Sequence, residues 1–187
     1  MEDRDIVKRI SENPEVFGEI VDVYENKLMR YIIRTTDISV PDAENLLQDI
    51  FIKVYRYIHE YDARYSFSSW IYRIAHNMII DNFRKHQKEI GNISLEDEEY
   101  MHLIHSLTDN NSPHRDLERK DIRMCVQKAI TLLKTDYREI IILRCIEGYS
   151  YEDIADILKI PIGTASTLVN RARKQLRENL IKLSCNS

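Results

Sequence analysis

The stretch YSYEDIADILKIPIGTASTLVNRARKQLRENL, residues 149–180, carries the most specific pattern in this chain of 187 residues. Ser150 and Asp153 have the spacing of a helix cap before a short apolar-periodic segment. KIPIG, residues 159–163, then predicts a tight turn, and a longer segment rich in Lys and Arg follows. A short helix, a tight turn and a long basic helix together predict a helix-turn-helix.

The long basic helix, residues 164–182, has two distinct faces when its residues are placed on a helical wheel. The predicted buried stripe consists of Ala165, Val169, Ala172, Leu176 and Leu180. The polar residues that point outward or lie at the flanks are Ser166, Thr167, Asn170, Arg171, Arg173, Lys174 and Arg177. A polar first half that reaches base edges and a basic second half that binds phosphates are typical of a DNA-recognition helix. The alternative is a solvated basic face on a C-terminal helix.

The N-terminal half shows three segments with helical periodicity. The first spans Pro14 to Thr36, and its apolar positions are Val16, Phe17, Ile20, Val23, Tyr24, Leu28, Tyr31 and Ile32. The second begins near Pro41, a residue suited to a first helical turn, and ends near Tyr61. Its apolar stripe consists of Ala43, Leu46, Leu47, Ile50, Phe51, Val54 and Tyr55. A polar loop, DARYS at 62–66, leads to the third segment.

The third segment, FSSWIYRIAHNMIIDNFRKH at 67–86, combines the only tryptophan of the chain with several cationic side chains. On the wheel, its core face consists of Ile71, Ile74, Ala75, Met78 and Ile79. The opposite arc consists of Trp70, Arg73, Asn77, Asp81 and Arg84. An exposed ring beside guanidinium groups suits single-stranded nucleic acid, because bases stack on rings while cations follow phosphates. The alternative is that Trp70 caps the core at the start of the helix.

Between these two halves the chain is acidic and rich in loop-forming residues. Residues 91–116 carry one basic and six acidic side chains, whereas residues 117–187 carry 13 basic and nine acidic ones. We expect a tether at 90–114, with one weak turn around Met101–Leu107. Beyond it, Leu117–Leu133 is amphipathic. In TDYREIIILRCIEG, Asp136 and Glu139 have capping-box spacing, and Gly148 is suited to end the helix.

Composition narrows the class of protein. Hydrophobic residues make up 43% of the chain, and the four Gly and four Pro predict long helices rather than β-hairpins, so we expect an all-α fold of two small helical domains. The three cysteines are far apart, which argues against a disulfide framework, and no Cys/His cluster predicts a metal. No segment has the length of a signal peptide or a membrane span. We therefore expect a cytoplasmic, reduced protein with no direct membrane insertion and no cofactor.

Two separate segments resemble the extracytoplasmic-function sigma factors of bacterial RNA polymerase. DAENLLQDIFIKVYRYIHEYD with FSSWIYRIAHNMIIDNFRK resembles their region 2, and YREIIILRCIEGYSYEDIADILKIPIGTASTLVNRARKQLRENL resembles their region 4. The resemblance covers about residues 14–88 and 117–183. It implies a region 2 domain at 1–89, an acidic linker at 90–116 and a region 4 domain at 117–187.

The resemblance implies an alternative sigma factor that lends promoter recognition and strand opening to core RNA polymerase. The expected partners are promoter DNA and the clamp helices and flap of the large polymerase subunits, with an anti-sigma factor as a further candidate. Polymerase docking is expected at Asn45, Gln48, Asp49 and Lys53. Minus-ten DNA is expected to contact Asp62, Ala63, Arg64, Tyr65, Ser66, Trp70, Arg73, Asn77 and Arg84. Minus-thirty-five DNA is expected to contact Thr164, Ser166, Thr167, Asn170, Arg171, Arg173, Lys174 and Arg177.

The chain departs from the family pattern at the start of the recognition segment. Ser166, Leu168 and Asn170 stand where Lys, Arg and His are common, which puts up to two DNA contacts in doubt. Lys159 stands where the turn often has Gly, and a left-handed backbone there would cost on the order of 1 kcal/mol.

Two other classes of protein compete with this interpretation. A free-standing helix-turn-helix regulator would explain residues 117–187 but would leave Trp70 and the docking face unexplained. An enzyme is disfavoured, because none of the six histidines stands in a recognisable catalytic spacing and no Gly-rich phosphate loop occurs.

Overall fold

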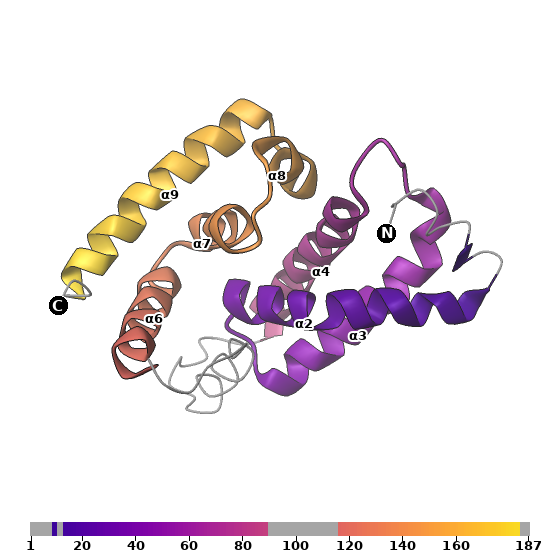
Figure 1. Ribbon diagram of the computed structural model, residues 1–187, viewed down its shortest axis with the longest axis horizontal. Coiled ribbons are helices and arrows are strands. Elements are labelled where there is room, and N and C mark those ends of the chain that lie inside the picture. Colours follow the sequence, from indigo (N-terminus) through magenta and orange to yellow (C-terminus); the bar gives the residue numbers. More distant parts are fainter. Residues whose placement is uncertain (1–8, 11–12, 90–115, 184–187) are drawn as a thin grey trace. The chain divides into compact units, whose positions relative to one another are not determined.

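The computed structural model describes residues 9–10, 13–89 and 116–183, and every element in this part of the chain is helical. The predicted all-α class is therefore confirmed. Packing of the Cα atoms separates two compact units, residues 1–107 with 156–159 and residues 108–155 with 160–187. The predicted tether with its weak turn lies at residues outside the described ranges. Figure 1 shows the helices in chain order.

The first unit is built from three long helices, α2 at Phe17–Thr35, α3 at Val40–Tyr57 and α4 at Phe67–Glu89. The short 3-10 turns η1 at Pro14–Val16 and η2 at Ile58–Glu60 extend α2 and α3. As predicted, Pro41 lies in the first turn of α3, where the hydroxyl of Ser39 accepts a hydrogen bond from the Asp42 backbone N–H at 3.3 Å. Each helix therefore begins and ends close to the predicted positions.

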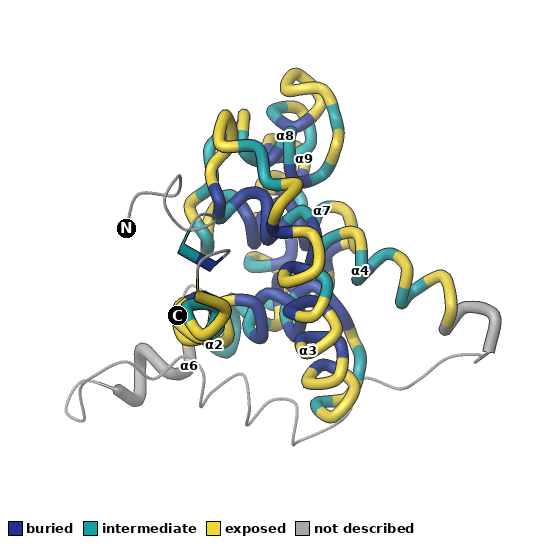
Figure 2. The backbone as a smooth tube through the Cα atoms, turned by 90° about the vertical axis from the view of Figure 1, so that its right-hand side faces the viewer, coloured by how far each residue is buried: buried dark blue, intermediate teal, exposed yellow. Residues whose placement is uncertain are grey.

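The core of the first unit is formed by the inner stripes of these three helices, drawn in dark blue in Figure 2. Most of the predicted stripes are confirmed, including Leu28, Ile32, Ile50 and Ile71, which are completely buried. Two apolar predictions are wrong. Val23 is 45% exposed and Tyr55 is 47% exposed, and the Tyr55 ring packs edge-on against the Phe17 ring at 5.1 Å.

The second unit contains α6 at Asp116–Thr131, α7 at Thr135–Ile141, residues 151–155 of α8 (Tyr151–Leu158) and α9 at Ile162–Lys182. Helix α7 continues into a π-helical turn, η3 at Ile142–Ile146. Gly148 follows with a φ of 82°, a conformation that glycine adopts at little cost, which agrees with its predicted role at the helix end.

The two predicted helix caps of this unit have different outcomes. Ser150 and Asp153 form the predicted reciprocal cap of α8: the Asp153 N–H donates to the Ser150 hydroxyl at 3.0 Å, and the Ser150 N–H donates to the Asp153 carboxylate at 3.2 Å. The predicted box at Asp136 and Glu139 is wrong. Helix α7 already begins at Thr135, so Asp136 lies inside its first turn and Glu139 is buried.

The end of α6 is stabilised by two buried polar side chains that come from other helices. The amide of Asn179 in α9 donates to the carbonyl of Ala129 at 3.0 Å, and the guanidinium of Arg138 in α7 donates to the carbonyl of Thr131 at 2.6 Å. Carbonyls in the last turn of a helix have no partner within the helix. These contacts therefore hold α6, α7 and α9 together around an otherwise aliphatic core.

The expectation that the cysteines are reduced is not met at Cys125. Cys125 in α6 is disulfide-bonded, whereas Cys145 is free and exposed. Within the described ranges, no helix has the length and hydrophobicity needed to cross a membrane.

Candidate nucleic-acid interface

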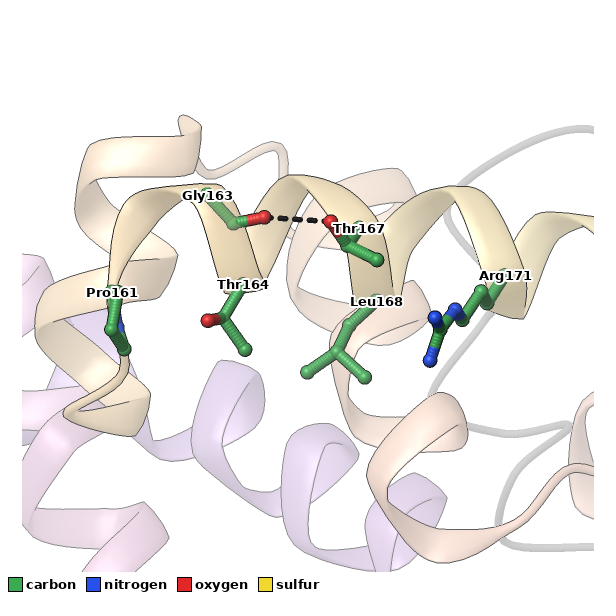
Figure 3. Close-up of a pocket in the computed structure, with 6 residues that line it drawn as sticks. All are labelled: Pro161, Gly163, Thr164, Thr167, Leu168 and Arg171. Atoms are coloured by element: carbon green, nitrogen blue, oxygen red, sulfur yellow. Dashed lines mark hydrogen bonds between the residues drawn. The ribbon is translucent and has the colours of Figure 1, made fainter.

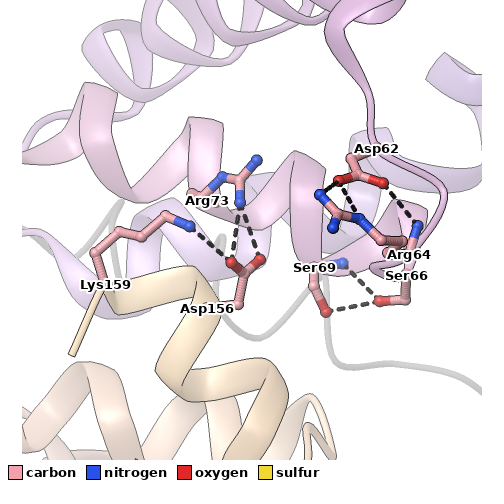
Figure 4. A network of polar contacts seen from close by, with 7 residues as sticks. All are labelled: Asp62, Arg64, Ser66, Ser69, Arg73, Asp156 and Lys159. Carbon is pink, nitrogen blue, oxygen red and sulfur yellow. Dashed lines mark hydrogen bonds and ion pairs between the residues drawn. The ribbon is translucent and has the colours of Figure 1, made fainter. Parts of the chain in front are cut away.

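The loop between α3 and α4, residues 62–66, is held by hydrogen bonds within and beside it (Figure 4). The carboxylate of Asp62 accepts from the Arg64 backbone N–H at 3.0 Å and from the Arg64 side-chain Nε at 2.7 Å. The Tyr61 hydroxyl donates to the Tyr65 carbonyl at 2.7 Å. At the end of the loop, the Ser66 hydroxyl caps α4 by accepting from the Ser69 N–H at 3.0 Å. The loop is thus structured while most of its side chains remain exposed.

Asp62 and Arg64 form an ion pair that shifts the pKa of both side chains. The hydrogen bond from the Arg64 side chain, followed by the one from its backbone, lowers the pKa of Asp62 below the ordinary value, and Asp62 in turn raises the pKa of Arg64. The guanidinium of Arg64 is held by Asp62, yet the Arg64 side chain is 83% exposed and remains accessible to solvent. Ala63, Tyr65 and Ser66 are also exposed.

Trp70 is buried, so the prediction that it lies on an exposed arc is wrong. Its exposed fraction is 4%, and its ring stacks on the Phe67 ring at 5.6 Å and meets the Tyr61 ring at 5.7 Å. Phe67 in turn touches Tyr24 of α2, with the ring centroids 6.1 Å apart. Trp70 therefore joins an aromatic cluster that anchors the first turn of α4, which is the core alternative considered from the sequence.

The rest of the predicted arc of α4 is partly accessible. Arg73 is half-buried, whereas Asn77, Asp81 and Arg84 are exposed. Arg84 lies 3.7 Å from Asp81, one helical turn earlier. An accessible polar face thus remains on α4, beyond its buried first turns.

The outward face of α3 presents the residues expected to dock on polymerase. Asn45, Gln48 and Asp49 are exposed, and Lys53 is half-buried. Ile52 lies among them with an exposed fraction of 50%. The face is therefore polar with one large apolar side chain, a composition that suits contact with another protein.

The turn between α8 and α9 adopts the geometry required by a helix-turn-helix. Lys159 has a φ of 54°, and the Ile160 N–H donates to the Ala155 carbonyl at 3.1 Å, a bond that closes the end of α8. Lys159 therefore has the left-handed conformation that was considered from the sequence. The Lys159 ammonium also pairs with the Asp156 carboxylate of the same helix end at 2.7 Å (Figure 4).

Helix α9 places most of the predicted DNA-contacting residues in solvent. Ala165, Val169 and Ala172 are completely buried, as predicted, whereas Leu176 and Leu180 are half-buried. The exposed members of the predicted set are Thr164, Thr167, Asn170, Arg171, Arg173, Lys174 and Arg177. Ser166 is half-buried. The basic side chains number five and the only acidic one is Glu178, so the accessible surface of α9 is strongly cationic.

Comparison with known families supports the two-part organisation. The family described as "Sigma-70 region 2" matches residues 20–89, and the family described as "Sigma-70, region 4" matches residues 123–176. The RNA polymerase sigma-H factor of Pseudomonas aeruginosa is 31% identical over 182 residues, which are 96% of this chain and 94% of that protein. The extracytoplasmic-function (ECF) sigma factor SigW of Bacillus subtilis is 32% identical over 181 residues, 94% of this chain and 96% of that protein. The chain belongs to the ECF sigma factors.

Solved structures agree with this assignment. The sigma factor RpoE of Bartonella quintana, solved with the anti-sigma factor NepR, is 26% identical with a TM-score of 0.66, covering 88% of this chain and 96% of that one. CnrH, solved with the cytosolic domain of CnrY, has a TM-score of 0.67 at 20% identity and shows the same fold. This protein is an alternative sigma factor that directs promoter-specific transcription initiation.

Two residues of this sigma factor were not anticipated at its candidate interfaces. Ile52 falls at the same helical spacing as Asn45, Gln48 and Asp49, so an isolated apolar residue on a polar arc was the available signal. Leu168 was noted only as a departure from the family, yet it lines an open depression on α9 with an accessible volume of about 420 Å³ (Figure 3).

Proposed function

We propose that this sigma factor docks on core RNA polymerase through α3, opens promoter DNA with the loop 62–66 and α4, and binds upstream duplex through α9. The observation that carries the proposal is similarity to sigma-H over 96% of the chain, which spans both regions. A free-standing helix-turn-helix regulator would account for the second unit alone. In this proposal the sigma factor acts in the cytoplasm. It has no bond-making chemistry of its own, because the polymerase supplies that chemistry.

Docking on polymerase is supported by the side chains of α3. The inward positions Ala43, Ile50 and Val54 are completely buried, so the helix cannot turn its polar arc inward without exposing its core. Asn45, Gln48 and Asp49 remain available for hydrogen bonds and ion pairs at the rim of an interface, and Ile52 supplies apolar area at its centre. We assign the clamp helices of core polymerase to this face.

Recognition of the opened minus-ten strand is supported by the loop 62–66. Its backbone is fixed by Asp62 and Tyr61, while Ala63, Arg64 and Tyr65 are exposed. A fixed loop with an exposed ring and an exposed guanidinium can receive a base extruded from the duplex, which costs a few kcal/mol that the contacts must offset. Asn77 and Arg84 of α4 would then contact the adjoining strand, whereas the Arg73 guanidinium already donates to the Asp156 carboxylate at 3.0 Å (Figure 4). Trp70 supports the loop from the core.

Binding to minus-thirty-five duplex is supported by the charge of α9. Arg171, Arg173, Lys174 and Arg177 are exposed, and phosphate contacts by such side chains supply most of the affinity of duplex binding. The flap of the large polymerase subunit is the proposed partner of this unit. An anti-sigma factor is a further proposed partner, because the similar RpoE was solved with one.

The docking assignment is tested by reversing charge on α3. Asp49→Lys should weaken binding to core polymerase by about fivefold, since an exposed ion pair is worth up to about 1 kcal/mol. Asp22→Lys is the matched control, because Asp22 is an exposed acidic residue on α2. Affinity is measured by fluorescence titration of labelled protein with core enzyme, and folding by circular dichroism.

Two outcomes would overturn the proposed function. If Asp49→Lys binds core enzyme as well as Asp22→Lys does, α3 is not the docking face. If the protein alone binds promoter duplex as tightly as the reconstituted holoenzyme does, it is a free-standing regulator.

A further inference from the structure

One flank of α9 carries an apolar side chain, Leu168, where a recognition helix is usually polar. Thr164, Thr167, Leu168 and Arg171 follow one another at the spacing of a helix face and, with Pro161 and Gly163, line the open depression shown in Figure 3. Leu168 is half-buried, and its side chain points to the same side as those of Thr164 and Arg171. No acidic side chain lines this depression.

The hydroxyl of Thr167 is already engaged within the helix. It donates to the Gly163 carbonyl at 2.8 Å, so its hydrogen is not available to a base. What Thr167 offers the depression is chiefly its methyl group, beside the branched side chain of Leu168. The centre of this face therefore has no free hydrogen-bond donor, and Arg171 places a cation at its edge.

In duplex DNA, one feature of the major groove is apolar: the 5-methyl group of thymine. Alanine, the threonine methyl and phenylalanine commonly contact it. We propose that Leu168 and Thr167 read thymine methyl groups in the upstream promoter element, with Arg171 binding an adjacent phosphate or guanine. Leu168 is then a specificity-determining residue of α9, and this inference rests on the proposed binding of upstream duplex by that helix.

Charge favours DNA over an apolar protein segment as the occupant of this face. Helix α9 carries five basic side chains and one acidic one, and Arg171, Lys174 and Arg177 are exposed on the same helix. A polyanion gains from these cations, whereas an apolar peptide segment gains nothing from them. The depression is also open rather than enclosed, as a surface that meets the edge of a base pair must be.

The test removes single methyl groups from DNA. Holoenzyme reconstituted with this protein first selects its promoters from a library with a randomised upstream element. Each thymine of the selected element is then replaced by deoxyuridine, which lacks only the 5-methyl group. With the wild-type protein, one or two replacements should each weaken binding by about fourfold, the effect of one buried methyl group. With Leu168→Ala, the replacement of the thymine that Leu168 contacts should have almost no effect.

Two variants make the outcome specific. Asn170→Ala, on the other flank of α9, should retain the full deoxyuridine effect. Arg173→Ala should reduce the salt dependence of binding by a slope of about 0.9, as expected for one lost phosphate contact, and should also retain the effect.

If the selected element lacks thymine, or if Leu168→Ala keeps the wild-type deoxyuridine effect, the inference is wrong. If Arg173→Ala still shows its smaller salt slope in that case, α9 binds upstream duplex and only the role of Leu168 has failed. If no variant of α9 alters binding to the upstream element, the proposed function of that helix fails as well.

Discussion

Helices α4 and α9 have similar sequence patterns but differ in how much of their surface is covered. Each has one apolar arc and an opposite arc with several cations, and the same wheel analysis applies to both. In α9 the wheel places all four of the basic residues Arg171, Arg173, Lys174 and Arg177 correctly in solvent. In α4 it fails at Trp70, which is 4% exposed.

The reason for this difference is the number of partners at the start of each helix. The first turns of α4 lie against α2, α3 and the residues that follow η2, so the rings of Tyr24, Tyr61 and Phe67 enclose an arc that the wheel assigns to solvent. The first turns of α9 bury only one stripe, at Ala165 and Val169. A helical wheel locates the principal core face of a helix, but it does not predict a second arc that other elements cover.

The largest effect expected from this comparison is at Trp70. Trp70→Ala should lower the free energy of unfolding by about 3–5 kcal/mol, because a large ring leaves a cavity in the aromatic cluster. Asn77→Ala, on the exposed arc of the same helix, should change it by no more than about 0.5 kcal/mol. Urea unfolding followed by circular dichroism measures both.

A functional assay sharpens the test of Trp70. If Trp70 acts only through folding, Trp70→Ala should reduce initiation equally on duplex promoters and on promoters whose minus-ten region is already mismatched. If Trp70→Ala leaves stability unchanged and reduces initiation only on duplex promoters, Trp70 contacts DNA.

A second prediction concerns the buried polar end of α9. Asn179→Ala should lower the free energy of unfolding by about 1–3 kcal/mol, because the Ala129 carbonyl at the end of α6 would lose its hydrogen bond in a buried place. The exposed neighbour Glu178 provides the control variant Glu178→Ala. Equal stability of the two variants would mean that water replaces the amide and that the contact does not hold α6 to α9.

Much of the fold follows from the sequence because local signals mark it. Apolar periodicity and the residues Pro41, Ser150 and Gly148 locate the helices closely. The sequence is less informative about groups that meet across long separations. Asn179 lies 50 residues from the carbonyl it binds, and Phe67 contacts Tyr24 from another helix, so neither contact has a local signature.

The same distinction between local signals and long-range contacts applies to the candidate site. The exposure of Asn45, Gln48 and Asp49 follows from one helix with one core face. The burial of Trp70 depends on three elements, and the apolar flank around Leu168 depends on the internal hydrogen bond of Thr167. The roles of these residues in binding polymerase and DNA remain predictions.

A third, smaller effect is expected at the turn before α9. Lys159 has a left-handed backbone, and glycine adopts this conformation without the steric cost borne by other residues. Both Lys159→Gly and Lys159→Ala lose the ion pair with Asp156, so their difference isolates the backbone. We expect Lys159→Gly to be more stable than Lys159→Ala by about 1 kcal/mol in urea unfolding. Equal stability would show that this turn relaxes when its side chain is removed.

The smallest effect is expected in the loop 62–66, where the Asp62 carboxylate is held by Arg64. A carboxylate whose pKa is lower in the folded chain stabilises the fold above its unfolded pKa, and this contribution is lost as the pH falls through the folded pKa. The window therefore lies below about pH 4, the ordinary range of aspartate. Carboxyl NMR should show Asp62 titrating below that value, and Arg64→Ala should move it back up. Arg84→Ala is the control, because Arg84 pairs with Asp81 on a different part of α4 and should leave the pKa of Asp62 unchanged. A normal Asp62 pKa in the wild-type protein would mean that Arg64 is free to move in solution and that the loop is not preorganised for a base.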